Sequence, residues 1–122
     1  MALTLTDFGS GLVIAKESAL GLTALKNIRN GPTTLYGIHI ANAGALAYLK
    51  LFDAEDVTVS GDGTDADFMF PGAATTDETI IPMFFPEGEL FENGLCMLAS
   101  TGLGTNHTGA PAGNFAVTLF LT

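Results

Sequence analysis

The side chains of this sequence that could act as nucleophiles or bind a metal are few. There are two histidines, His39 and His107, and one cysteine, Cys96. A zinc or non-haem iron site needs converging histidine and carboxylate ligands, and no His-x-His or His-x-x-x-His spacing occurs. A thiolate nucleophile would need a histidine beside it, but Cys96 stands in an apolar segment, where cysteine usually acts as a small buried hydrophobe. We therefore expect that the chain is not an enzyme and carries no cofactor.

The two histidines differ in their sequence contexts. His39 lies among alternating apolar residues, so we expect it to be a structural residue of a strand. His107 lies in a glycine-rich loop, residues 100–113, and is expected to face solvent. Neither context predicts a catalytic role.

An acidic segment carries the remaining candidate site. Asp62, Asp65 and Asp67 place three carboxylates within six positions. Calcium prefers several oxygen ligands from one flexible loop, but this spacing does not match an EF-hand loop, which needs glycine at its sixth position and glutamate at its twelfth. Carboxylates are also common in turns, where they bond to their own backbone. We expect a solvated acidic turn, with calcium binding as the alternative.

The charge of the chain argues against two classes of partner. Thirteen acidic residues outnumber four basic ones, which gives a formal net charge of −9. All four bases lie in the first fifty residues, and residues 51–122 hold eleven acids and no base. Nucleic-acid binding requires clustered basic residues that neutralise phosphates, and an anionic membrane surface would repel such a chain. We therefore expect neither nucleic acid nor a membrane as a partner.

In the segments that must position these residues, apolar side chains alternate with others as they do in β-strands. Apolar positions recur with period two in residues 36–41, 47–52 and 115–121. Clusters of Gly, Pro, Asn and Asp separate short segments along the chain. About eight short strands, two of them within residues 12–28, predict an all-β, single-domain, jelly-roll-like antiparallel β-sandwich. In this prediction residues 12–122 form the sandwich, and residues 1–11 form an N-terminal arm or an edge strand.

Several of the predicted strands are apolar on both faces. Tyr48 and Phe52 occupy the second face of one strand, and Phe120 occupies the second face of the last strand. So small a domain cannot bury all of these side chains in one core. We expect some of them to form contacts between subunits, because homomeric interfaces resemble a core cut in half.

The order of motifs in residues 35–102 resembles a group of small virion proteins encoded by tailed phages. The pattern of that group is a Leu-Tyr-Gly-Ile strand, a Tyr-Leu-Lys-Leu-Tyr/Phe strand, an Ile-Pro strand and a Phe-x-Asn-Gly-Leu turn. This chain has all four, at residues 35–38, 48–52, 81–82 and 91–95. It departs from the group in its more acidic middle and in Met83-Phe84-Phe85. The resemblance covers a little over half of the chain, and its motifs are structural rather than catalytic.

The resemblance implies a jelly-roll protein that decorates or cements a phage capsid, commonly as a homotrimer. Its partner would be the major capsid protein, and its location would be the virion surface. A tail or fibre accessory protein is a related possibility. The alternative from another class is a β-sandwich module that binds carbohydrate or a host surface. The absence of tryptophan and the presence of only two tyrosines count against a sugar-binding platform.

The residues expected to act in this function are interface residues rather than catalysts. Leu3 and Leu5 of the N-terminal segment are the candidates for contact with the capsid, where they could add a strand to an exposed sheet edge. The candidates for contacts within the trimer are Tyr48, Phe52, Phe84, Phe85 and Phe120.

Overall fold

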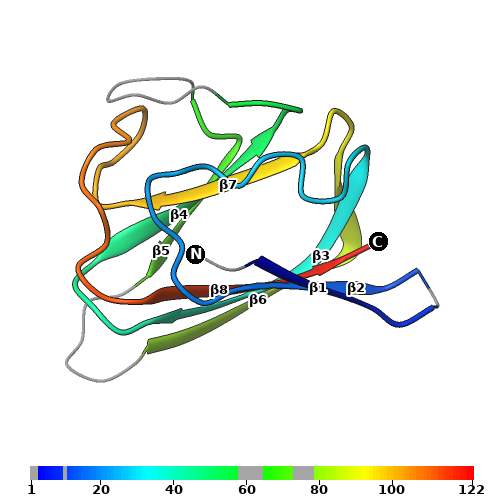
Figure 1. Cartoon of the computed structure of the whole chain (residues 1–122), viewed down its shortest axis with the longest axis horizontal. Helices are drawn as coiled ribbons and strands as arrows, with labels where there is room; N and C mark the ends of the chain where they lie inside the picture. Colours follow the sequence, from blue (N-terminus) through cyan, green and yellow to red (C-terminus); the bar gives the residue numbers. More distant parts are fainter. Residues whose placement is uncertain (1–2, 10, 58–64, 73–78) are drawn as a thin grey trace.

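The computed structural model describes residues 3–9, 11–57, 65–72 and 79–122, which contain eight strands and no helix. Figure 1 shows the strands, which are β1 (Leu3–Asp7), β2 (Val13–Glu17), β3 (Thr33–Asn42), β4 (Ala47–Asp53), β5 (Phe68–Gly72), β6 (Thr79–Phe91), β7 (Leu95–Ser100) and β8 (Phe115–Leu121).

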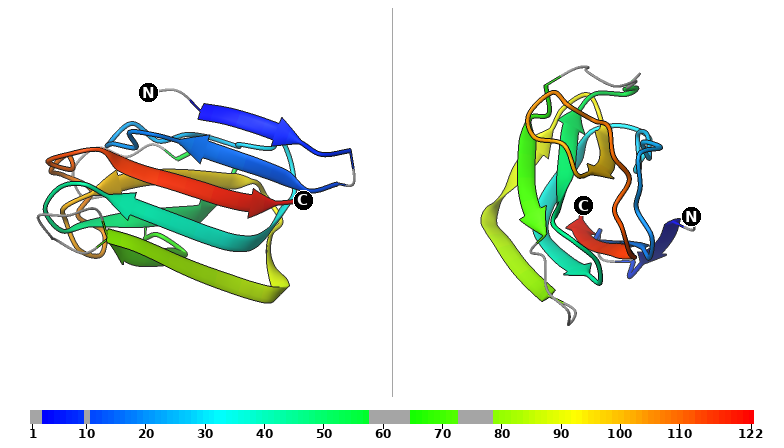
Figure 2. Two further views of the ribbon diagram at one scale, coloured as in Figure 1. Left: turned by 90° about the horizontal axis from the view of Figure 1, so that it is seen from below. Right: turned by 90° about the vertical axis from the view of Figure 1, so that its left-hand side faces the viewer.

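The strands form two antiparallel sheets that pack against each other. The large sheet has the order β1-β2-β8-β3-β6, and the small sheet has the order β5-β4-β7. Figure 2 shows the five strands of the large sheet side by side in the view from below. The predicted all-β sandwich of about eight strands is therefore confirmed.

The strand pairs are nested, as in a ribbon of antiparallel pairs that has been rolled up. β4 pairs with β5, β3 with β6, and β2 with β8, so early strands pair with late ones. The segment around Leu25 completes the series, because its backbone exchanges two hydrogen bonds with Met97 of β7, at 2.8 and 2.9 Å. The order of strands is that of a jelly roll, with β1 added at one edge.

Of the two strands predicted within residues 12–28, the first is present and the second is wrong. β2 is a full strand, but the second segment is reduced to an isolated bridge at Leu25. Asn27 has a φ of 46°, which is incompatible with extended backbone, so regular pairing stops two residues after the bridge. Ile28 still donates its N–H to the carbonyl of Leu95, at 2.9 Å, and the segment covers the free edge of β7.

The main core lies between the two sheets and follows the predicted alternation. In β8, Val117, Leu119 and Leu121 are buried, while the residues between them are only half buried. Leu49 and Leu51 of β4 face them across the sandwich in the same cluster. Burial of each such side chain contributes about 1.5–3 kcal/mol, so this core supplies the main driving force for folding.

A second, smaller apolar cluster lies on the outer face of the small sheet. It consists of Phe52 on β4, Cys96 and Leu98 on β7, and Val57 beyond the end of β4. Every residue of β7 is buried, so this strand is covered on both faces. The apolar second face of β4 is thus covered largely by the chain's own segments. The expectation that Phe52 forms a subunit contact is therefore wrong, since only 1% of its surface is exposed.

Candidate interaction surface

The outer face of the large sheet carries a row of residues that crosses four strands. Ile14 of β2 pairs with Phe120 of β8, Phe120 pairs with Gly37 of β3, and Gly37 pairs with Phe84 of β6. Their neighbours along each strand point into the core, so the side chains of this row point outward. Phe84 is 74% exposed, which is the largest exposure of any large apolar residue described.

Gly37 joins the two phenylalanines into one surface. A Cβ atom at Gly37 would lie 3.1 Å from a ring carbon of Phe120 and 3.5 Å from a ring carbon of Phe84. Both rings therefore approach the glycine from opposite sides and cover its backbone. The absence of a side chain at position 37 lets the apolar row continue across β3.

Next to this row the sheet is hollowed into a trough. Lys16 of β2 and His39 of β3 flank Thr118 of β8, and the small side chains of Ala116 and Ala41 form the next row. The hollow between Ile14, Lys16, His39, Thr118 and Phe120 has a volume of about 340 Å³. It continues past Ala41 and Ala116. Small residues on the central strand and longer ones on its two neighbours produce this shape.

The trough differs in charge from the rest of the chain. The outward positions of β2, β3 and β8 hold one lysine and one histidine and no carboxylate, although the chain carries −9 overall. Glu17 of β2 is buried, and it lines the far end of the trough together with Ser18. Lys16 itself is exposed. This face is therefore apolar and weakly basic in an acidic protein.

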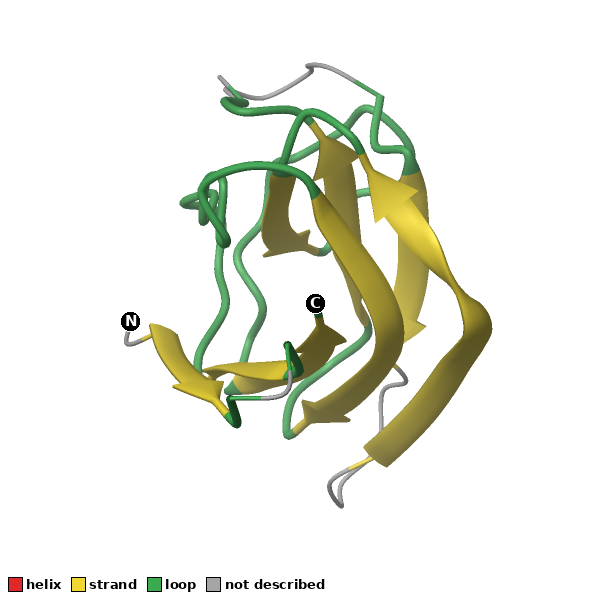
Figure 3. Ribbon diagram, turned by 90° about the vertical axis from the view of Figure 1, so that its right-hand side faces the viewer, coloured by secondary structure: helices red, strands yellow, loops and turns green. Residues whose placement is uncertain are grey.

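The edge strand β6 bends sharply beside this face. Leu35 of β3 pairs with Glu89 and Gly37 pairs with Phe84, so residues 85–88 of β6 stand opposite the single residue Tyr36. Such a large bulge bends a strand away from its sheet, and Figure 3 shows the corner in β6. We call residues 85–89 the β6 corner.

Gly88 makes the close approach at the β6 corner possible. Its φ is 80°, and a Cβ atom there would lie 2.5 Å from Cγ2 of Thr34 and 2.9 Å from the ring of Tyr36. Both the backbone conformation and the space require glycine. The bend therefore requires glycine at position 88, because Thr34 and Tyr36 of β3 leave no space for a side chain there.

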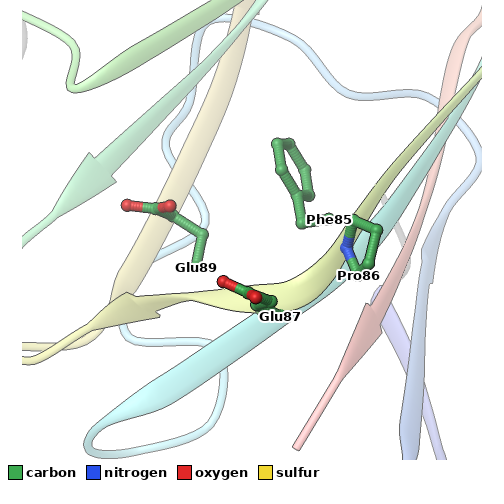
Figure 4. A pocket seen from close by; sticks show the side chains of 5 residues that line it. Phe85, Pro86, Glu87 and Glu89 are labelled. Carbon is green, nitrogen blue, oxygen red and sulfur yellow. The ribbon is translucent and has the colours of Figure 1, made fainter.

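The β6 corner contains an acidic hollow. Its lining consists of Phe85, Pro86, Glu87, Gly88 and Glu89, and its volume is about 400 Å³. Figure 4 shows the side chains of Glu87 and Glu89 leaving the corner on separate paths, with the ring of Phe85 projecting from the same strand. Two carboxylates beside an aromatic ring and a proline form a site that can bind a cation carried on an aliphatic stem.

The candidates for trimer contacts are distributed over different parts of the fold. Phe84 and Phe120 lie on the outer face of the large sheet. Phe85 is half buried, packs against the main core and lies 6.3 Å from the ring of Phe70. Tyr48 is half buried on the outer side of the small sheet, with Phe52 further along the same side. The structure therefore brings together only two of the five predicted contact residues, Phe84 and Phe120.

The two leucines predicted to contact the capsid lie on β1, the edge strand of the large sheet. β1 is hydrogen-bonded to β2 along its whole length, with Leu3 opposite Glu17 and Leu5 opposite Ala15. Leu3 packs against the main core, whereas Leu5 is 45% exposed. Among the described strands, none lies beside the outer edge of β1.

A buried polar cluster under the glycine-rich loop was missed by the sequence analysis. Lys50 of β4 is fully buried. Its Nζ donates to the carbonyls of Gly104, at 3.1 Å, and Asn106, at 2.7 Å, and lies 2.9 Å from Nδ1 of His107. Burial lowers the pKa of Lys50. An ammonium has only donors, so a charged Lys50 requires that Nδ1 of His107 be the acceptor.

His107 is only 3% exposed, so the expectation that it faces solvent is wrong. Its ring packs edge-on against Phe52, with 5.6 Å between the ring centroids. The loop thus folds back over the outer face of the small sheet and is fastened there by Lys50. No local sequence pattern signals this contact, because Lys50 and His107 are far apart in the chain.

Cys96 behaves as the sequence predicted, as a buried residue of an apolar strand. Its Sγ donates to the carbonyl of Ala54 at 3.1 Å and accepts from the N–H of Asn27 at 3.3 Å. Burial raises the pKa of the thiol, which keeps it protonated. His39 lies in β3 as expected, on the outer face of the large sheet, and so does not meet Cys96 in one pocket.

The acidic segment falls partly outside the described residues, which exclude Asp62. Asp65 is exposed, and the carboxylate of Asp67 accepts the N–H of Asp53 at 2.6 Å. Within the described ranges no group of three or more His, Cys, Asp or Glu side chains is placed to hold a metal. The described part of the chain also has no helix of the length and apolarity needed to cross a membrane.

Comparison with protein-family models, curated proteins and solved structures finds no match to this chain. The exposed apolar row, the trough beside it and the β6 corner are therefore the features from which a function can be inferred.

Proposed function

We propose that this chain is a structural protein of a tailed-phage virion, a homotrimer that decorates the capsid and holds neighbouring capsid subunits together. The observation that carries the proposal is the outer face of the large sheet, where the exposed ring of Phe84 and the half-buried ring of Phe120 flank Gly37. The motifs at residues 35–38, 48–52, 81–82 and 91–95 supply the resemblance to small virion proteins.

An exposed phenylalanine beside a half-buried one favours association with another protein surface. Soluble monomers rarely expose large contiguous apolar patches, and interfaces are enriched in aromatic residues. Phe84 alone would gain up to about 1.5–3 kcal/mol on full burial. Because the same face carries no carboxylate on β2, β3 and β8, a second copy could approach it without meeting the charge that repels acidic chains elsewhere.

β1 offers a separate surface for the capsid. No strand in the described part of the chain pairs with its outer edge, and Leu5 is 45% exposed next to that edge. An extended segment of a capsid subunit could pair with this edge through backbone hydrogen bonds. A decorating protein needs both kinds of surface, one for its own copies and one for the capsid.

The oligomeric state is the first test. Light scattering of the purified chain at micromolar concentration should give about three times 12.6 kDa. A clean monomer under these conditions would contradict the homotrimer.

The second test is the composition of virus particles. Mass spectrometry and gel densitometry of purified particles should find the protein in hundreds of copies, and removal of the protein should lower the temperature at which the heads release DNA. Its absence from particles, together with measurable binding on a glycan array, would favour the carbohydrate-binding alternative.

A further inference from the structure

We infer that in the homotrimer Lys16 of one copy enters the β6 corner of the next copy and lies between Glu87 and Glu89. This inference rests on the proposed function in requiring a homotrimer, and it adds which two surfaces meet. The occupant of the acidic hollow is a second copy of this chain.

Lys16 is the basic residue best placed for such a contact. It is exposed on the outer face of the large sheet. Lys50 is buried in its own cluster, and Lys26 pairs with Asp56 at 2.6 Å. Arg29 is half buried. The other three bases are thus buried, paired or partly covered within the chain.

The β6 corner is complementary to a lysine side chain. Glu87 and Glu89 provide two carboxylates for the ammonium, and Phe85 and Pro86 provide an apolar wall for the aliphatic stem. The hollow, of about 400 Å³, has ample room for one such side chain. Charge and shape therefore agree in favouring a lysine of a partner.

These two surfaces cannot meet within one chain. Lys16 is on β2 and the corner is on β6, with β8 and β3 between them in the sheet. Three strand spacings correspond to about 14 Å. We therefore place the contact between two copies. A contact of two different surfaces repeats head to tail, and in a homotrimer it joins the three copies in a ring.

The residues around Lys16 give this contact an apolar border. Ile14 and Phe120 line the same trough as Lys16, and Phe84 is exposed close to the corner on β6. A symmetric pairing of two outer faces would instead bring the basic residues of both copies together. The head-to-tail arrangement places Lys16 of each copy against Glu87 and Glu89 of the next copy.

Charge reversal with rescue tests the inference. Three variants are compared with the wild-type chain by sedimentation equilibrium at low and high salt: Lys16→Glu, the double variant Glu87→Lys/Glu89→Lys, and the triple variant that combines them. Matched controls reverse charges elsewhere, with Lys26→Glu for the first variant and Glu55→Lys/Glu92→Lys for the second. Circular dichroism verifies that each variant is folded.

The expected result is a loss of trimer in the first two variants and its recovery in the third. Each of the first two should weaken the trimer at least about tenfold, as close charge pairs at interfaces do, and the triple variant should return to within about threefold of wild type. The controls should stay within about threefold of wild type. High salt should reduce the difference in trimer stability between Lys16→Glu and the wild type, because it screens the pair.

Two results would overturn the inference, and they differ in what they say of the proposed function. A wild-type trimer that Lys16→Glu leaves intact, or that the triple variant fails to restore, overturns the contact alone and leaves the decorating trimer in place. A wild-type chain that is monomeric at tens of micromolar overturns both.

Discussion

At the scale of single residues, Lys50 shows how the chain holds an amino group in its interior through carbonyl and imidazole partners. Its ammonium is fully buried, and two carbonyls of the glycine-rich loop, from Gly104 and Asn106, and Nδ1 of His107 satisfy its three donors. The cost of desolvating the charge is offset by three hydrogen bonds that also fasten the loop to β4. Lys50 therefore serves as an anchor for the loop.

Replacement of Lys50 by methionine should destabilise the protein. Lys50→Met keeps the length and apolar stem of the side chain but removes the Nζ hydrogen bonds to the carbonyls of Gly104 and Asn106 and the contact with Nδ1 of His107. We expect a loss of about 1–3 kcal/mol in the free energy of unfolding, measured by urea denaturation, together with faster proteolysis within residues 101–114. Lys26→Met, at an exposed position, is the control. Unchanged stability of Lys50→Met would contradict the anchoring role.

The stability of the protein should also depend on pH through Lys50. Burial lowers its pKa in the folded state below the ordinary value of 10.5, so between these two pKa values the unfolded chain binds more protons than the folded chain. Stability must then rise with pH in that window. We expect the free energy of unfolding of the wild type, minus that of Lys50→Met, to increase as the pH is raised from neutral toward 10.5. A flat or falling difference would show that burial does not penalise the charge.

The β6 corner is the main feature at the scale of secondary-structure elements. A strand that continued straight would place residues 85–89 in register with β3, whereas the bulge opposes four of them to Tyr36 alone. The resulting corner carries Glu87 and Glu89 out of the regular ladder and forms the acidic hollow. The geometry of the candidate site thus depends on an irregularity of one strand.

A side chain at position 88 should damage this element. Gly88→Ala forces a residue with a Cβ atom into a φ of 80° and against Thr34, so we expect a loss of about 1–3 kcal/mol, read as a lower Tm by differential scanning calorimetry. Gly21→Ala is the matched control, because a Cβ atom at Gly21 has no neighbour within 4 Å. If the two variants melt at the same temperature, the corner does not need glycine.

At the scale of the whole molecule, the apolar surface is divided between the interior and one exposed face. The chain covers the second face of β4 and both faces of β7 largely with its own segments, and leaves the row through Phe84 and Phe120 on the outside of the large sheet. This face is also the one that lacks carboxylates on β2, β3 and β8. Association through it would bury apolar surface where the acidic charge is lowest.

Phe84 should therefore matter for self-association and little for folding. Phe84→Ser removes a ring that is 74% exposed, so the free energy of unfolding of the monomer should change by less than about 0.5 kcal/mol. The trimer dissociation constant should rise at least about tenfold by sedimentation equilibrium. Leu103→Ser, at a residue 62% exposed in the loop, is the control and should leave association unchanged. An equal effect of both substitutions would argue against a specific interface.

Much of the fold could be predicted from the sequence, because the signals are local. The alternation in β3, β4 and β8 follows from the two-residue period of a strand, and turn residues mark the breaks between strands. The same period identified Phe120 as lying on the outward face and Cys96 as belonging to an apolar strand. These features can be predicted from the identities of residues that are near neighbours in the chain.

What the tertiary structure alone decided are the contacts between residues distant in sequence. Phe52 lies on the outward face of β4, and only the folded chain shows that its own segments cover that face. Lys50 and His107 meet because the loop before β8 folds over β4, and Leu25 pairs with β7 across a similar separation. Gly88 is required because Thr34 and Tyr36 of another strand lie against it. The sequence by itself determined which segments are strands and which residues are apolar, since both depend on local chemistry. Which apolar faces stay exposed depends on how the strands and loops pack, and that is a property of the whole chain.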